Sequence, residues 1–157
     1  MSDETLLLLA KDVRGKTLRI LQDVTESQAR FAPPGLNNTI LWHAGHSLVV
    51  VEALSLAPAL GRAPAYPSDW FDKFSWTSTP ATVKEWPTLG DVKAKLAEQA
   101  EQLFGAISAL SSSQLSQLTG DPSKGRTLRW SILHGLHDEA GHQGEIWLLK
   151  KLQTKGK

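Results

Sequence analysis

The chain has 157 residues, 41% of them hydrophobic and 21% charged, which is typical of one globular domain with a buried core. Its 17 Lys and Arg residues nearly cancel its 16 Asp and Glu residues, and the formal net charge of +1 gives no field that would attract nucleic acid. The absence of cysteine excludes disulfides, thiolate nucleophiles and Cys-type zinc or iron–sulfur sites. We therefore expect a single domain over residues 1–157 that does not bind nucleic acid.

Two long helices are predicted in the first third of the chain. Apolar residues recur at helical spacing over residues 3–23, and a capping-box pattern at residues 25–28 opens a short turn after them. The second long helix is expected over about residues 39–57, because residues 37–39 offer side-chain oxygens as caps. Pro58 is expected to end it, since proline cannot continue a helix.

A long, aromatic-rich connection follows at residues 58–88. Its prolines argue against regular structure, yet it holds too many large aromatic side chains for a mobile linker, because each can bury roughly 150–250 Å². We expect this crossover loop to fold back over the helices. With Trp42 of the second helix, its residues Trp70, Phe74 and Trp76 are candidates to line a pocket.

The second half of the chain predicts two more long helices. One is expected over about residues 90–110, capped from within residues 88–91, and the other over about residues 127–153. A short helix and a turn separate them, and no strand pattern or internal repeat competes. Four long helices, with a short connection after the first and a long one after the second, predict an all-α four-helix bundle.

Neither a membrane span nor a signal peptide is expected. No segment approaches the roughly 18 consecutive apolar residues that a spanning helix needs. The apolar stretch at residues 6–10 is flanked by Asp3, Glu4 and Lys11, which is unlike a secretory leader. These observations predict a cytoplasmic protein without membrane association.

The five histidines fall in two clusters, and the larger lies on the fourth predicted helix. A rotation of about 100° per residue places Asp138, His142, His134 and Glu145 within one arc of about 80°. Asp138 and His142, one turn apart, can bind one ion. His134 is a candidate for a further ligand, and Glu145 for a ligand or for a group that orients one.

The second helix carries His43 and His46, three residues apart, and either can face the interior. Two glycines adjoin the histidine clusters, Gly45 beside His46 and Gly141 beside His142. Each costs a helix about 1 kcal/mol relative to alanine, which is tolerated more readily where another element must approach closely. Imidazole and carboxylate ligands together suit Zn, Ni, Fe or Mn, and the residues do not rank these metals.

Other metal and nucleophile motifs fit poorly. A zincin needs two histidines four residues apart, but His137 and His142 are five apart. A di-iron carboxylate bundle needs two Glu-x-x-His motifs, and the chain has only Glu139-x-x-His142. A Ser-His-Asp hydrolase would need a Gly-x-Ser-x-Gly elbow, which is missing.

Three stretches together resemble the DinB/YfiT-like superfamily of metal-dependent four-helix bundles. Residues 38–46 (NTILWHAGH) resemble the segment of the second helix that ends in a metal-binding histidine. Residues 137–146 (HDEAGHQGEI) resemble the signature of the fourth helix, and residues 70–76 (WFDKFSW) are similar to aromatic loops of some members. The resemblance covers nearly the whole chain in helix order.

The resemblance implies particular ligands and a class of reaction. It assigns metal binding to His46 and His142; Asp138 stands where the family commonly has a histidine, which gives a His-Asp-His triad. It also implies up-down-down-up connectivity and frequent homodimers. Several relatives resemble transferases that use a low-molecular-weight thiol, in which a metal would deprotonate the thiol for attack on an electrophile.

Three hypotheses follow. The leading one is a metalloenzyme with one divalent ion, acting on a small molecule as a thiol transferase or a hydrolase, in which Glu145 or His43 orients ligands or moves protons. The second is a non-catalytic metal-binding or stress-response bundle. In the third, the histidines form a polar patch at a dimer interface that titrates near pH 6–7.

Overall fold

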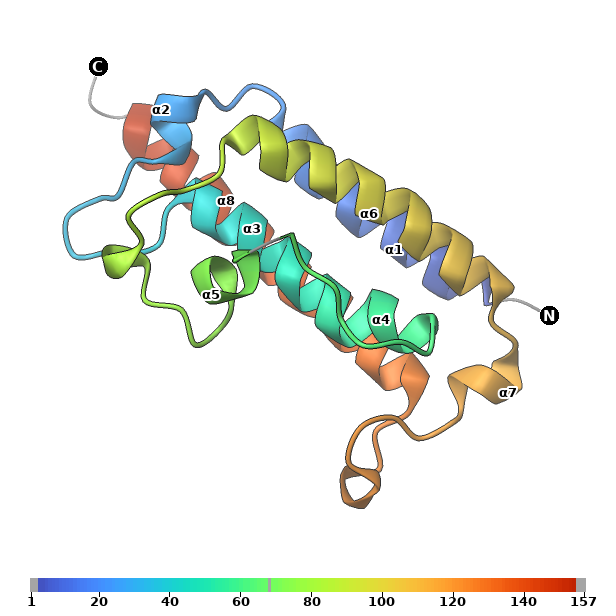
Figure 1. The fold of residues 1–157 in the computed structure, drawn as a ribbon. Helices are drawn as coiled ribbons and strands as arrows, with labels where there is room; N and C mark the ends of the chain where they lie inside the picture. The colour runs from blue at the N-terminus through green and yellow to red at the C-terminus, as the bar shows by residue number, and fades with distance from the viewer. Residues whose placement is uncertain (1–2, 68, 155–157) are drawn as a thin grey trace.

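The computed structural model describes residues 3–67 and 69–154, and the regular secondary structure within them is helical, with one isolated bridge between Leu118 and Thr127 (Figure 1). The prediction of an all-α protein is confirmed. Its long helical segments are α1 (Glu4–Leu21), α3 (Ile40–Val51) with its continuation through η1 (Glu52–Leu56) and α4 (Ala57–Ala59), α6 (Leu89–Ala109) and α8 (Leu128–Thr154).

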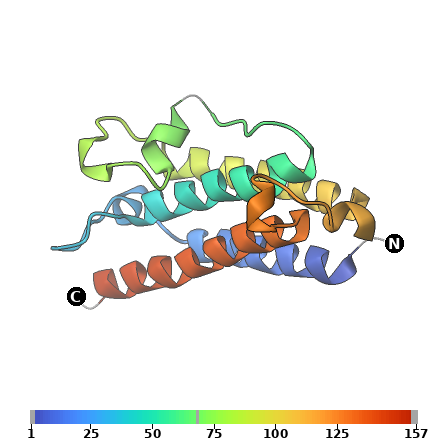
Figure 2. The same cartoon turned by 90° about the horizontal axis from the view of Figure 1, so that it is seen from below.

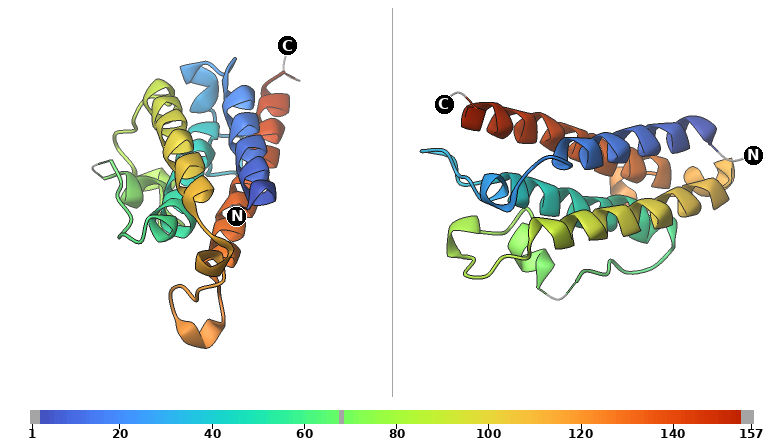
Figure 3. Two further views of the ribbon diagram at one scale, coloured as in Figure 1. Left: turned by 90° about the vertical axis from the view of Figure 1, so that its right-hand side faces the viewer. Right: turned by 90° about the horizontal axis from the view of Figure 1, so that it is seen from above.

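These four segments lie side by side around a shared core (Figures 2 and 3). α3 packs against α8, α8 against α1, α1 against α6, and α6 against α3. Each long segment therefore turns one side toward two neighbours. The short helices α2 (Glu26–Ala29) and α7 (Ser112–Leu115) and the 3-10 turn η3 (Pro122–Lys124) lie in the connections.

The helix starts follow local side-chain chemistry. Asp3 caps α1 by accepting from the amide of Leu6, and Thr39 caps α3 by accepting from the amide of Trp42. Capping boxes precede the three helices α2, α6 and α7, and each supplies a hydroxyl and a carboxylate or amide to otherwise unpaired backbone groups. These caps explain why the predicted starts agree with the structure to within a few residues.

The expectation that Pro58 ends the second helix is wrong. α3 widens into the π-helix η1, and the helical path continues through Pro58 to Ala59. Proline has no amide proton to give the carbonyl of Leu54, four residues earlier. That carbonyl instead accepts from the hydroxyl of Ser131 on α8, at 2.6 Å. A neighbouring helix thus satisfies the group that proline leaves open.

The crossover loop has more regular structure than expected. It contains α5 (Trp70–Phe74) and the 3-10 turn η2 (Pro80–Thr82), and α5 packs against α3. Trp70 and Phe74 are buried, as the density of aromatic residues predicted. Gly45 makes the contact with α3 possible, because a β-carbon there would lie 2.3 Å from the Phe74 ring.

The most apolar segment belongs to the core. Residues Ile40–Ala59 have the length and a mean hydropathy of 1.4 that a membrane span would need, so the expectation that no segment approaches this limit is wrong. However, 89% of the most apolar 18-residue window of that stretch is buried inside the protein. The segment thus forms part of the buried core of the fold.

Candidate metal centre

α3 and α8 bring together the three residues that the sequence predicted as ligands. His46 comes from α3, and Asp138 and His142 lie one turn apart on α8. The Nε2 atoms of His46 and His142 lie 3.6 Å and 3.4 Å from Asp138 Oδ1. One donor atom of each residue lies within 4.8 Å of the others. A cation about 2 Å from each donor fits this spacing.

His46 is held with its Nε2 atom ready to bind. Its Nδ1 atom lies 2.6 Å from the backbone carbonyl of Phe74. Because a carbonyl only accepts, Nδ1 must carry the proton, and Nε2 then presents a lone pair. The Trp42 ring stacks on the other side of the imidazole, with centroids 4.6 Å apart, and donates from Nε1 to the hydroxyl of Ser78. Both neighbours restrict rotation of the ring.

Asp138 supplies the clearest sign that this cluster could hold a cation. Its Oδ1 atom is buried and makes no hydrogen bond within the described part of the chain. A buried carboxylate oxygen without a partner is costly, and native proteins rarely leave one. Oδ1 faces the Nε2 atoms of His46 and His142. Three lone-pair donors therefore converge on one point, which is an arrangement that a divalent ion satisfies.

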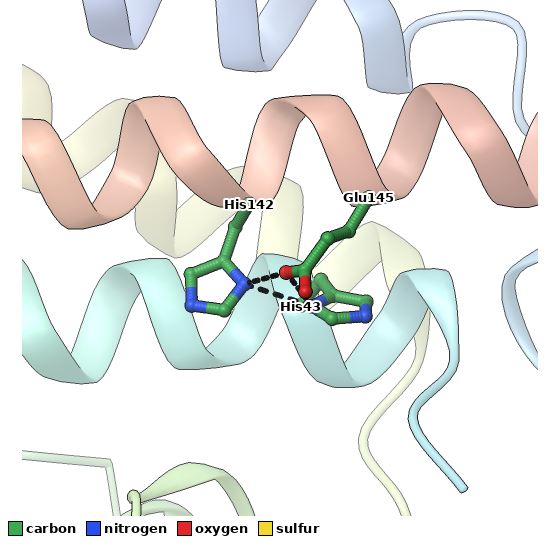
Figure 4. Close-up of side chains that lie close together, drawn as sticks. All are labelled: His43, His142 and Glu145. Atoms are coloured by element: carbon green, nitrogen blue, oxygen red, sulfur yellow. Dashed lines mark hydrogen bonds and ion pairs between the residues drawn. The ribbon is translucent and has the colours of Figure 1, made fainter. Parts of the chain in front are cut away.

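A second cluster shares His142 and lies on the other side of its ring (Figure 4). Glu145 lies three residues after His142, and its Oε2 atom contacts His142 Nδ1 and lies 3.0 Å from His43 Nδ1. The two Nδ1 atoms are 2.9 Å apart. One carboxylate oxygen can accept from both imidazoles, so this cluster satisfies its own polar atoms.

The two clusters therefore have different roles. With the Nδ1 proton of His142 donated to Glu145, its Nε2 atom is the free donor, and that atom faces His46 and Asp138. A carboxylate on the far nitrogen is the usual way in which a metal-binding histidine is oriented. We therefore assign His46, Asp138 and His142 as the candidate ligands and Glu145 and His43 as the groups behind them.

The electrostatics agree with this division. Burial, together with the nearby rings of His142 and His46, lowers the pKa of His43 to about 3, and burial also lowers the pKa of His46. Burial alone would lower the pKa of His142, but the carboxylates of Asp138 and Glu145 outweigh it and raise that pKa. His43 and His46 are thus neutral near pH 7, as a ligand must be, and a proton competes at His142 where a cation would bind.

Asp138 is held ionised by its neighbours. Burial would raise the pKa of its carboxyl, but the adjacent rings of His142 and His46 lower it below the ordinary value. An ionised carboxylate between two imidazoles supplies the negative charge of the cluster. It is an acceptable ligand in place of the histidine that the resemblance led us to expect.

The remaining predicted residues lie at different distances from the cluster. His134 is exposed and stacks on Trp130, with centroids 4.7 Å apart, and it belongs to neither described cluster. Eight residues separate it from His142, which is about 12 Å along a helix. Trp70 packs on Phe74 in the core, and Trp76 is 59% exposed. Of the predicted pocket residues, Trp42 and Phe74 touch the cluster.

Two features of the candidate metal site were not predicted from the sequence. One is the Phe74 carbonyl, for which the only signal was Gly45 beside His46. The other is a fully buried ion pair between Arg14 and Glu139, which lies next to Asp138 in the chain. A charged residue on an amphipathic helix usually points to solvent, so no sequence pattern indicated that either residue would be buried.

Fold and site define an all-helical protein with a histidine–aspartate cluster that could hold one divalent cation. The family model of the DinB superfamily matches residues 9–146, and the chain belongs to that superfamily. A conserved protein from Enterococcus faecalis has a similar crystal structure, with a TM-score of 0.73 over 100% of this chain and 99% of that one. Its sequence identity of 16% makes this a likeness of fold. No curated protein matches the chain.

Proposed function

We propose that this protein is a divalent-metal-dependent enzyme in which His46, Asp138 and His142 hold a single ion. The observation that carries the proposal is the convergence of two imidazole lone pairs on the unpartnered Oδ1 of Asp138. We further propose that its four long helices form an up-down-down-up bundle. The chain direction seen in the colours of Figure 1 and the contacts between neighbouring helices support that connectivity.

The proposed reaction is transfer of a low-molecular-weight thiol to an electrophile, with hydrolysis as the related alternative. Three protein ligands leave positions open, and a divalent ion held there supplies Lewis acidity that lowers the pKa of a bound thiol or water. Glu145 holds the Nδ1 proton of His142 and thereby fixes the ligand ring. The Nδ1 atom of the neutral His43 lies 3.0 Å from the same carboxylate, and a proton on that nitrogen would leave the Nε2 atom of His43 as a proton acceptor.

A surface hollow supports a small molecule as substrate. It has a volume of about 340 Å³ and is lined by His43, Glu145 and the amides of Asn37 and Asn38, together with leucine side chains. A mixed polar and apolar lining of this size suits a small organic molecule. Its position beside Glu145 and His43 places such a molecule next to the groups that we assign to proton movement.

The first experiment is elemental analysis of untagged protein purified without added metal or chelator. The proposal expects about one equivalent of Zn, Ni, Fe or Mn per chain, and loss of that metal in His46→Ala with helicity retained. A metal-loaded wild type should then be screened with thiols and an electrophile. Absence of metal, with no uptake from those ions, would overturn the site. A full, non-exchanging ligand shell would favour the non-catalytic alternative.

We also propose that the protein is a cytoplasmic homodimer that uses the outer face of α8. This face carries apolar side chains that the single chain leaves 38–52% exposed: Trp130, Leu133, Trp147, Leu148 and Leu152. Clustered exposed apolar groups are characteristic of interaction surfaces. Sedimentation of the wild type should give a dimer, and Trp147→Arg should give a folded monomer. A monomeric wild type at high protein concentration would refute the proposal.

A further inference from the structure

α8 has apolar residues on all sides, so hydrophobic burial by itself does not fix its rotation about its axis. Ile146 and Leu149 are buried in the core, but Trp147 and Leu148 beside them are 45% and 52% exposed. A rotated helix would exchange some of these side chains for others of similar size. Something else must hold α8 in the rotation that turns Asp138 and His142 toward α3.

The side of α8 that faces α1 carries buried polar groups with directional partners. Glu139 is fully buried, and its carboxylate accepts from Arg14 Nε at 2.8 Å and from a second guanidinium nitrogen at 3.0 Å. The hydroxyl of Thr17 donates to the same carboxylate at 2.6 Å. Two guanidinium bonds in a fixed fork and a third from a hydroxyl allow this carboxylate one position.

Gln143, one turn after Glu139, also forms hydrogen bonds to α1. Its amide donates to the carbonyl of Val13 at 2.8 Å and to the hydroxyl of Thr17 at 2.9 Å. Both Gln143 and Glu139 therefore bind the same turn of α1 around Thr17. Two contacts a helical turn apart resist rotation and sliding of α8 together, because neither partner can move without breaking a buried hydrogen bond.

Arg14 extends the attachment to the other long helices. It also donates to the carbonyl of Leu96 and to the side chain of Gln99, both on α6. Gln99 in turn donates to the carbonyl of Leu48 on α3, two residues beyond His46. The buried network thus links α8, α1, α6 and α3, which include both helices that carry the candidate ligands.

The geometry connects this network to the metal cluster. Glu139 and Gln143 each follow a candidate ligand by one residue, so the two pairs lie about 100° apart on the same two turns of α8. A rotation of about 20° would move an atom at the helix surface, about 5–6 Å from the axis, by about 2 Å. Metal sites tolerate deviations of only about 0.2 Å in ligand distance. The hydrogen bonds of Glu139 and Gln143 to α1 therefore keep Asp138 and His142 directed toward α3.

We propose that the ion pair of Arg14 and Glu139, with Thr17 and Gln143, positions Asp138 and His142 for metal binding. This proposal rests on the proposed function, since it concerns the same three ligands. The four residues would position the ligands without contacting the metal ion. Stability alone gives little reason for such a network, because buried ion pairs can often be replaced by apolar side chains without loss.

The test replaces the ion pair of Arg14 and Glu139 and distinguishes a loss of fold stability from a displacement of the metal ligands. The double variant Arg14→Met, Glu139→Leu leaves no unpaired charge, so we expect it to fold, with some loss of stability because Gln99 and Thr17 each lose a buried partner. We expect its affinity for Co²⁺ or Zn²⁺, measured by competition with a chelator, to fall at least tenfold. The visible absorption of the Co²⁺ form, which reports ligand geometry, should also change.

Two further variants complete the test. Gln143→Leu removes only neutral hydrogen bonds and should weaken Co²⁺ binding less, with a spectral change in the same direction. Leu136→Ala creates a cavity in a fully buried part of α8 without removing any hydrogen bond of the network, and should lower stability while the affinity of the folded protein stays within twofold.

The outcomes are distinct. A folded double variant, or a folded Gln143→Leu, with wild-type affinity and an unchanged Co²⁺ spectrum would overturn the positioning role while the metal site stands. If Leu136→Ala lost affinity as strongly as the double variant, general destabilisation would be the cause and the inference would fail. A wild type that binds neither ion would overturn the site and this inference together.

Discussion

Gly45 shows how one missing side chain arranges the candidate site. The Phe74 ring fills the space where a β-carbon would stand, and this contact brings the Phe74 carbonyl onto His46 Nδ1. The tautomer that makes His46 a candidate ligand thus depends on a glycine one position earlier in the helix. Gly141, beside His142, has no described atom within 4 Å of the equivalent position.

Replacing these two glycines should have opposite effects. Gly45→Ala places a methyl group inside the Phe74 ring, so we expect a loss of about 1–3 kcal/mol of unfolding free energy and weaker metal binding. Gly141→Ala should gain about 0.5–1 kcal/mol, because alanine favours a helix and nothing obstructs it. Urea unfolding of the metal-free variants measures both values. Equal effects would contradict the contact with Phe74.

His43 should make the metal-free protein less stable in acid. Its pKa is about 3 when folded and 6.5 in the unfolded chain, so only the unfolded chain takes up this proton between those values. Stability therefore falls as the pH is lowered from about 6.5 to about 3, by up to about 1.4 kcal/mol per pH unit for one proton. His142, whose pKa is raised, contributes stability that is instead lost as the pH rises above 6.5.

The comparison with His43→Asn isolates this term. Titratable groups that do not contact His43 are the same in both proteins, so their contribution cancels in the difference between the two stability curves. Urea unfolding at intervals from pH 7 to pH 4 should show a shallower acid decline in the variant. Parallel curves would mean that His43 is protonated in the folded protein and lies in a more polar setting.

Residue periodicity was sufficient to place the two candidate ligands of α8 on one face and insufficient to exclude His134. The angle per residue placed Asp138 and His142 on one face and placed His134 on the same arc. It did not include distance along the axis, which leaves His134 about 12 Å from His142 and stacked on Trp130. The partners of His46 and Glu139 come from residues 28 and 125 positions away, and no local pattern contains them.

At the scale of elements, the transition from α3 to η1 explains how a helix passes through proline. The widened turn begins at Glu52, and α8 approaches it so closely that a β-carbon at Gly135 would lie 2.3 Å from the hydroxyl of Ser55. That closeness lets Ser131 reach the Leu54 carbonyl. Starts of helices were predictable because caps are local, whereas this end depends on a side chain 77 residues away.

Removing the Ser131 hydroxyl should therefore cost more than an ordinary surface serine. In Ser131→Ala the partly buried carbonyl of Leu54 loses its partner, and we expect a loss of about 1–3 kcal/mol. Ser108→Ala is the matched control, since that exposed hydroxyl bonds only to the carbonyl of Phe104 in its own helix. The control should change stability by less than about 0.5 kcal/mol. Thermal unfolding of both variants measures the two losses, and equal losses would contradict the role of Ser131.

At the scale of the whole molecule, the polar network and the metal cluster together join helices that are distant in sequence. Arg14 and Gln99 link α1, α6 and α3, while the candidate ligands link α3 and α8. Local opening of one long helix would break buried hydrogen bonds to the others. We therefore expect the chain to unfold as one unit, as predicted for a single domain.

Metal should stabilise that unit as a whole. An ion that binds only the folded state adds about 2.7 kcal/mol at a hundredfold excess over its Kd, which is about 5–11 °C in Tm for a domain of this size. Tryptophan fluorescence and far-UV circular dichroism should report the same Tm, with and without metal. Asp138→Asn keeps the shape of the side chain but removes its charge, and should abolish most of the shift. An equal shift in that variant would place the stabilising ion elsewhere, and separate transitions for the two signals would show that the helices do not unfold together.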